Sequence, residues 1–310
     1  MSDTKQRYGL LDLYRFLLGF WVLSCHDFFF VQNTTGHFSV AELAPDFFFV
    51  ISGYFLLKSM QKKKYVPVHI GMRDLLRARI KPLFFSICFI TTFNLVCTAL
   101  FIRDDVFYSL FLMFRYWWYV VYLYAAVALF YCAYKLIKTK RGFVIFLFAT
   151  AIIMGVLDYL LELGIIPIYE LTFSTRTLGC MSTGMLISYI PKLKFKKFNY
   201  NILITALLIP ILFILAYNEK DFFTCLLMII LFASLVYFTT NISFGGKVFD
   251  VLGQLGTRMY LYMSFITTIY LLGITHHRIL FVIDVALASM DLVIYHYKQK
   301  YEAARAKSVE

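Results

Sequence analysis

The sequence predicts an all-α, polytopic membrane protein with about ten transmembrane helices and both termini in the cytoplasm. Composition, ten long apolar stretches and the placement of basic residues predict this class. The 310 residues are 61% hydrophobic and 15% charged, whereas soluble domains average ~45–50% apolar and ~25% charged residues. A soluble chain of this size cannot hide so much apolar surface from water. The composition therefore excludes a soluble globular enzyme, a disordered chain and a fibrous protein.

Ten apolar stretches approach the ~20 residues that a membrane helix needs. They cover residues 10–31, 42–60, 82–102, 116–137, 142–161, 177–191, 199–217, 222–242, 259–275 and 279–296. The sixth stretch is short, and the preceding loop, 162–176, is rich enough in Leu and Ile to lie partly in the membrane. We expect one integral-membrane domain over residues 1–310, with no soluble second domain.

The basic residues divide unequally between the two sides of this arrangement. Of the 30 Lys and Arg residues, 24 fall on the side of the termini, five on the other side, and Arg15 lies inside the first stretch. This count puts Arg258 in an inner loop and Arg176 in the outer loop 162–176. Because Lys and Arg accumulate in cytoplasmic loops, the basic loop 58–81 and the tail 297–310 are expected in the cytoplasm. The same bias explains most of the net charge of +12 without a nucleic-acid partner.

The first apolar stretch contains three ionisable residues, Asp12, Arg15 and His26. Such residues are costly in hydrocarbon and are usually functional. On a helix, the eleven-residue step from Arg15 to His26 is about 20° more than three turns, so both residues share a face about 16 Å apart. This spacing suits a long ligand whose anionic head lies at the membrane surface and whose reactive end reaches inward. Arg15 alone is equally well explained as an interfacial anchor.

Other stretches carry weaker signals. The second stretch begins near Asp46 and contains Ser52 and Gly53, which also suit close helix packing. Asp284 and Asp291 share one face of the last stretch, without an assignable partner.

Five segments carry recognisable motifs: Leu11-Asp12-x-x-Arg15-x10-His26, Asp46-Phe-Phe-Phe-Val-Ile-Ser52-Gly53-Tyr54, Arg77-x-Arg79-Ile-x-Pro82, Trp117-Trp118-Tyr119, and Leu252-Gly-x-Leu-Gly256 through Tyr260-Leu261. Together these segments resemble the acyltransferase-3 family of multi-pass membrane acyltransferases. The first two motifs are specific as a pair, and the others are looser. Two features depart from the family: Met263 stands where members often carry a histidine, and the chain has no fused extracytoplasmic domain.

The resemblance implies transfer of an acyl group, expected to be acetyl, from cytoplasmic acyl-CoA to a hydroxyl of a cell-envelope or exopolysaccharide glycan. His26 matches the family's catalytic histidine and would act either as a general base or as an acylated intermediate. We expect acetyl-CoA as donor substrate, a glycan or lipid-linked glycan as acceptor, membrane lipids as surroundings, and neither a metal nor nucleic acid. The expected location is the cell membrane.

The remaining candidate residues divide between the donor and the acceptor. Donor phosphates would be held by Arg15, oriented by Asp12, and by Arg77, Arg79 and Lys81, because Arg and Lys bind phosphate. The cytoplasmic bias of basic residues explains the last three equally well. The acceptor is assigned to Asp46, Ser52 and Trp118; for Trp118 a stacking platform competes with an ordinary interfacial aromatic belt.

Two other functions stay open. A transporter or flippase of a small molecule or lipid-linked sugar would also carry ionisable residues in the membrane. Transporters often have paired, Gly- or Pro-broken helices in two halves, and no such pairing is evident. A non-catalytic scaffold leaves the alignment of Arg15 with His26 unexplained.

Overall fold

The computed structural model describes residues 8–26, 40–62, 71–101, 118–168, 170–193, 200–216, 222–242, 245–271 and 277–307. Within these ranges every regular element is a helix, and no strand occurs. The prediction of an all-helical fold is therefore confirmed for the described part of the chain.

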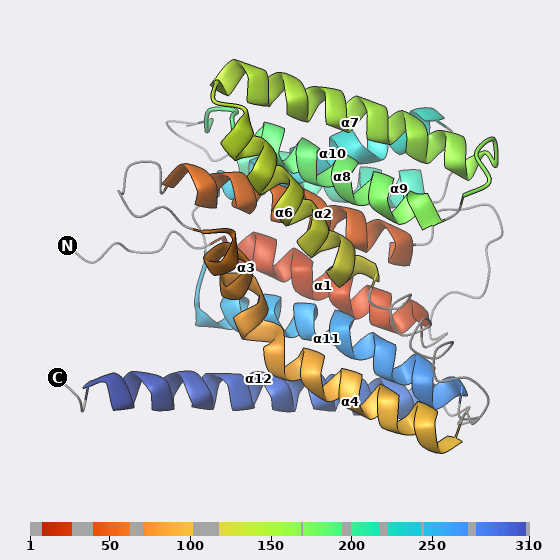
Figure 1. The fold of residues 1–310 in the computed structure, drawn as a ribbon, viewed down its shortest axis with the longest axis vertical. Coiled ribbons are helices and arrows are strands. Elements are labelled where there is room, and N and C mark those ends of the chain that lie inside the picture. Colours follow the sequence, from red (N-terminus) through yellow and green to blue (C-terminus); the bar gives the residue numbers. More distant parts are fainter. Residues whose placement is uncertain are drawn as a thin grey trace. The chain divides into compact units, whose positions relative to one another are not determined.

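The chain divides into two compact units, and the division falls inside α1 (Gly9–His26) and α3 (Met72–Ile80). The first unit contains α2 (Val40–Lys62), α6 (Trp118–Leu136), α7 (Lys140–Glu162), α8 (Glu170–Ile187), α9 (Tyr200–Ala216) and α10 (Phe222–Thr240). The second contains most of α1, the 3-10 turn η2 (Lys81–Leu83), α4 (Phe84–Phe101), α11 (Lys247–Leu271) and α12 (His277–Lys307). Each unit is described by itself (Figure 1).

Helix α8 is the centre of the first unit. It packs most extensively against α2 and α7, between which it lies in Figure 1, and it also contacts α6 and α10. Two glycines let α2 and α8 approach closely: a Cβ on Gly53 would collide with the Met181 carbonyl, and one on Gly184 with the Val50 carbonyl. Small residues of this kind allow helix backbones to meet. The interface therefore depends on the absence of two side-chain atoms.

Helix α11 has the corresponding place in the second unit. It packs against α12 and α4, and the ring of Tyr262 lies 6.3 Å from that of Phe89 on α4. On α1, Phe20 meets Phe281 of α12 edge to face at 5.4 Å. The helices of this unit are thus joined by aromatic contacts as well as by the polar contacts described below.

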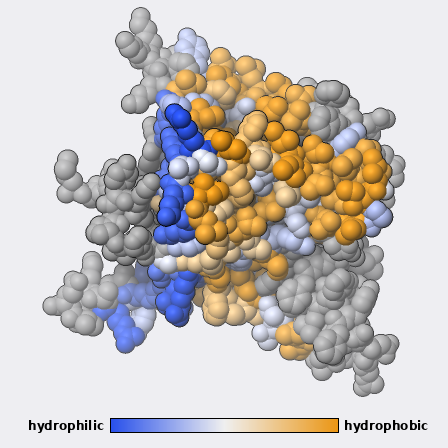
Figure 2. Space-filling view, turned by 45° about the horizontal axis from the view of Figure 1, so that its top comes forward, coloured by the Kyte–Doolittle hydropathy of each residue, from blue (hydrophilic) through white to orange (hydrophobic). Residues whose placement is uncertain are grey.

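Helix α7 presents an apolar face to its surroundings. Its exposed face contains Ile145 (68% exposed), Phe148 (59%), Ile152 (51%), Ile153 (54%) and Val156 (42%). Among the described residues, two helical segments, Tyr119–Leu136 and Lys140–Leu161, are long and apolar enough to cross a membrane. On the face drawn in Figure 2, hydrophobic residues cover most of the coloured surface.

Each of the ten apolar stretches overlaps a helix, but two helices, α8 and α11, begin more than a turn before the predicted start. Helix α8 starts at Glu170, so Arg176 lies inside a helix and not in the loop 162–176. Helix α11 starts at Lys247, so the placement of Arg258 in an inner loop is wrong. In the sequence, each arginine marks the end of an apolar segment. In the structure, each pairs with a carboxylate that neutralises its charge, so it can lie within a helix. The basic loop 58–81 also contains a helix, α3.

Candidate functional site

Asp12 and Arg15 form an ion pair on one face of α1. The Arg15 Nη1 donates to Asp12 Oδ1 at 3.4 Å, and the two side chains are 31% and 22% exposed. Residues three apart on a helix are neighbours on its surface, so the pairing follows from the spacing in the sequence. The carboxylate restrains the guanidinium without removing it from solvent, and most of its N–H donors remain available for an anion.

Two glycines of α11 lie directly against this pair. A Cβ added to Gly253 would lie 2.8 Å from both Cβ and Oδ1 of Asp12, and one added to Gly256 would lie 2.6 Å from the Cα of Phe16. The latter Cβ would also come within 2.5 Å of the Arg15 carbonyl oxygen. The first-helix motif and the later Leu252–Gly256 motif, which are far apart in sequence, therefore contact each other.

His26 is the last residue of α1. The helix is continuous from Gly9, so the backbone carries the predicted eleven-residue helical step between Arg15 and His26. The side chain of His26 lies outside the described residues, and its catalytic role stays a prediction.

The other candidate donor residues, besides Asp12 and Arg15, lie on α3 and η2. Arg77 is exposed on α3, while the side chain of Arg79 lies outside the described residues. Lys81 Nζ pairs with Glu302 Oε2 of α12 at 3.2 Å, and the two side chains are 64% and 47% exposed. Exposed pairs of this kind contribute little stability. Lys81 is therefore held by an acid that an incoming phosphate can displace at small cost.

The acceptor candidates lie in the first unit. Asp46 accepts two hydrogen bonds from Arg176 of α8, Nε to Oδ1 at 3.1 Å and Nη2 to Oδ2 at 2.9 Å. These side chains are 16% and 14% exposed, so Asp46 forms a half-buried bidentate pair that the sequence did not reveal. Ser52 is half-buried on α2. The side chain of Trp118 lies outside the described residues.

The aromatic start of α6 is partly used for packing. The ring of Tyr119 lies 4.5 Å from that of Phe49 and 6.2 Å from that of Phe48, both on α2. The aromatic side chain that follows Trp118 therefore stabilises the contact between α6 and α2.

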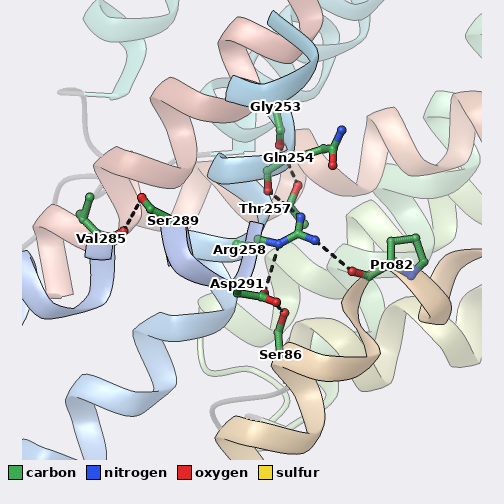
Figure 3. Close-up of polar contacts among 9 residues, drawn as sticks. All are labelled: Pro82, Ser86, Gly253, Gln254, Thr257, Arg258, Val285, Ser289 and Asp291. Atoms are coloured by element: carbon green, nitrogen blue, oxygen red, sulfur yellow. Dashed lines mark hydrogen bonds and ion pairs between the residues drawn. The ribbon is translucent and has the colours of Figure 1, made fainter. Parts of the chain in front are cut away.

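A buried polar network, which sequence reasoning missed, joins three helices of the second unit (Figure 3). Arg258 of α11 donates from Nε to Asp291 Oδ2 of α12 at 3.1 Å and from Nη2 to the Pro82 carbonyl at 3.1 Å. Ser86 of α4 also donates to Asp291. The side chains of Arg258 and Asp291 are 2% and 3% exposed. The available signal was the apolar run that begins directly after Arg258, at Met259-Tyr260-Leu261.

Lysines meet tyrosines where α2, α8 and α10 end. Lys192 donates to the Thr240 carbonyl at 3.2 Å and lies over the Tyr8 ring at 5.4 Å. Partial burial lowers the pKa of Lys192, and the nearby Lys58 ammonium lowers it further. Burial raises the pKa of Tyr8 to about 12. Among the described residues, no group of three or more His, Cys, Asp or Glu side chains could hold a metal ion.

Comparison of the chain with protein-family models, curated proteins and solved structures gave no match. The resemblance to the acyltransferase-3 family therefore stays a prediction from the sequence motifs.

Proposed function

We propose that the protein is a multi-pass membrane O-acyltransferase. It moves an acyl group, acetyl in the first instance, from acyl-CoA on the cytoplasmic side to a hydroxyl of a cell-envelope or exopolysaccharide glycan. In this proposal all ten apolar stretches cross the membrane, and both termini are cytoplasmic.

The observation that carries the proposal is the contact between two motifs on α1 and α11. Asp12 and Arg15 lie against Gly253 and Gly256, where the missing Cβ atoms let the backbones meet. The two motifs are far apart in the sequence, and a shared site would explain why they lie together. A guanidinium held by a carboxylate at the end of a helix suits the phosphates of a nucleotide-bearing donor.

The exposed apolar faces support the membrane setting. A hydrophobic face such as that of α7 is unfavourable in water and favourable in lipid. Its exposed residues recur at positions 145, 148, 152 and 156, which is the spacing of a single helix face. Exposed apolar side chains also occur on α4, α9, α10 and α12, for example Phe84, Leu207, Ile230 and Val293.

The proposed chemistry places His26 at the acyl group. As a general base, its imidazole takes the proton of the acceptor hydroxyl while that oxygen attacks the thioester carbonyl; the C–S bond then breaks, and the CoA thiolate accepts a proton. As a nucleophile, the imidazole first takes the acyl group and gives up its proton to the departing CoA thiolate; the glycan hydroxyl then attacks the acyl-imidazole, the C–N bond breaks, and the hydroxyl proton passes to the released imidazole. Both routes require an uncharged imidazole that can accept a proton.

The test is acyl transfer by the purified protein in lipid nanodiscs, with acetyl-CoA and envelope glycans from a strain that lacks the gene. Mass spectrometry of the glycans should show a gain of one acetyl group per modified sugar. His26→Gln should reduce this transfer by ~10²–10⁴, while binding acetyl-CoA like the parent protein. Arg141→Lys, at an exposed position of α7, is the matched control and should transfer normally.

A transporter gives a different result. The acyl content of envelope glycans would be the same in cells with and without the gene, and the purified protein would release no CoA. Substantial acylation by a folded His26→Gln variant would contradict both histidine mechanisms.

A further inference from the structure

We infer that Arg258, together with Asp291, is a positioning residue that fixes the chain segment Lys81–Ser86, which links the donor-binding arginines of α3 to α4. The role of α3 in donor binding rests on the proposed function. The contacts that fix the segment are observed independently of it. We call this segment the α3–α4 junction.

The junction is a place where the regular helical ladder is interrupted. Pro82 lies at the start of η2 and has no N–H to donate. A proline ring also clashes with the carbonyl four residues earlier in a regular α-helix. The chain therefore passes from α3 to α4 through a 3-10 turn, and local hydrogen bonds alone specify its path poorly.

Hydrogen bonds from Arg258, on α11, fix the path of the chain at the junction. Its Nη2 donates to the Pro82 carbonyl at 3.1 Å, and its Nη1 donates to the Gln254 carbonyl one turn earlier on α11 at 3.3 Å. The guanidinium is planar, so fixing two of its donors on α11 and α12 fixes the direction of the third. The Pro82 carbonyl is thereby held at a defined position.

Asp291 holds the arginine and the junction together. Its Oδ2 accepts from Arg258 Nε at 3.1 Å and also from the Ser86 hydroxyl, four residues after Pro82. The Tyr295 ring, one turn further along α12, lies 4.9 Å from Arg258 Cζ. Because both charged side chains are almost completely buried, loss of one partner leaves an uncompensated charge in the interior.

A second contact reaches the same junction from the same helix. Lys81 pairs with Glu302, which follows Asp291 by eleven residues and so lies on nearly the same face of α12. The junction is thus contacted by α12 at an exposed pair and at a buried pair. The buried pair is the stronger restraint, because the exposed one is open to water and salt.

The position of the junction determines the position of Arg77 and Arg79. These residues lie only three to five positions before Pro82, on a helix of nine residues. A displaced junction therefore moves the backbone that carries both residues. Since Arg258 is buried, its contribution is to donor affinity through α3 and not to the chemical step.

Three variants test the inference. Arg258→Lys keeps the charge but loses the planar fork. Asp291→Asn keeps the size but loses the charge. The double variant Arg258→Met with Asp291→Leu replaces the pair by apolar side chains, which often preserves or increases stability. The double variant therefore separates positioning from folding, and Arg141→Lys again serves as control.

Two readouts are measured on the whole protein in nanodiscs. The first is steady-state acyl transfer: the KM for acetyl-CoA should rise about tenfold, the size expected for a lost hydrogen bond to a charged group, with kcat within about twofold of the parent. The second is the rate of tryptic cleavage after Arg77 and Arg79, identified by mass spectrometry. Cleavage requires local opening of the chain and should accelerate about tenfold in the double variant, without acetyl-CoA present.

The outcomes are distinguishable. A folded double variant with unchanged KM and unchanged cleavage overturns the inference, as does a fall in kcat at constant KM. If the parent protein does not bind acetyl-CoA, the proposed function fails, and accelerated cleavage would still support the fixing of the junction. Normal cleavage in that case would overturn this part as well.

Discussion

Substitution of Gly184 by alanine should destabilise the first unit by separating α2 from α8. A Cβ at this position would collide with the Val50 carbonyl oxygen and lie 2.8 Å from its carbon and 3.0 Å from the Tyr54 nitrogen. All three atoms belong to the backbone, so no side-chain rotation can relieve the overlap. Overpacking costs ~1–3 kcal/mol, and we expect the upper part of this range.

The helix propensity of alanine offsets part of this cost. Alanine is favoured over glycine in a helix by ~0.5–1 kcal/mol, which leaves a net loss of about 2 kcal/mol. Gly155 on α7 is the matched control, because a Cβ there would have no neighbour within 4 Å. Gly155→Ala should therefore be stabilised by the propensity term alone, and the two variants should differ by about 3 kcal/mol.

The assay is thermal unfolding of the purified variants in one detergent, followed by intrinsic fluorescence. A loss of about 2 kcal/mol corresponds to a decrease in apparent Tm of about 4–8 °C, whereas Gly155→Ala should unfold at or slightly above the temperature of the parent protein. Equal or higher stability of Gly184→Ala compared with Gly155→Ala would refute the close approach of α2 and α8. Gly53→Ala should behave like Gly184→Ala, and the double variant should cost less than the sum because both widen one interface.

Three further predictions concern the ion pair, the topology and the pH dependence. Asp46→Asn should lower the free energy of unfolding by ~1.5–3 kcal/mol, the range for hydrogen bonds to charged groups, and the exchange of Asp46 with Arg176 should recover part of it; equal stability of the single variant and the parent would contradict the pair. In intact cells, a cysteine at position 165 should react with an impermeant maleimide and a cysteine at position 63 should not; the reverse pattern would overturn the topology. Because the folded protein holds the proton of Tyr8 up to a pKa of about 12, whereas the unfolded chain loses it near 10, folding stability should decline between these pH values. Tyr8→Phe should make that decline shallower in Tm measured against pH, and an identical pH profile would exclude this contribution.

The positions of the helices were largely predictable, because long apolar stretches are a local property of the sequence. The errors occurred where a charge is neutralised by a distant partner. The predicted ninth stretch began only after Arg258, because an isolated charge is read as the end of an apolar segment, whereas the carboxylate partner of Arg258, Asp291, lies on the next helix. Arg176 was placed in a loop for the same reason, since Asp46 lies 130 residues earlier. A hydropathy pattern counts each charge at its full cost and does not detect these pairings.

The candidate site was predictable in part. The pairing of Asp12 with Arg15 follows from a spacing of three residues on one helix. Their contact with Gly253 and Gly256 was not predictable from spacing, because it depends on how α11 packs against α1. The exposed pair of Lys81 with Glu302 also escaped notice, since it joins segments 221 residues apart. Local motifs thus identified the residues, and tertiary packing determined their neighbours.

The apolar face of α7 has a consequence for the choice of membrane. In the proposed setting, the apolar part of this helix runs from Phe143 to Leu161, roughly 28 Å at 1.5 Å per residue. This length matches the ~27 Å hydrocarbon layer of thin bilayers and falls short of thicker, sterol-rich ones. A thicker bilayer would bring hydrocarbon towards the charged ends, Lys140 and Glu162, and would have to thin locally around α7. Since α7 packs along α8, a mismatch between α7 and the bilayer would also strain α8, which carries Arg176.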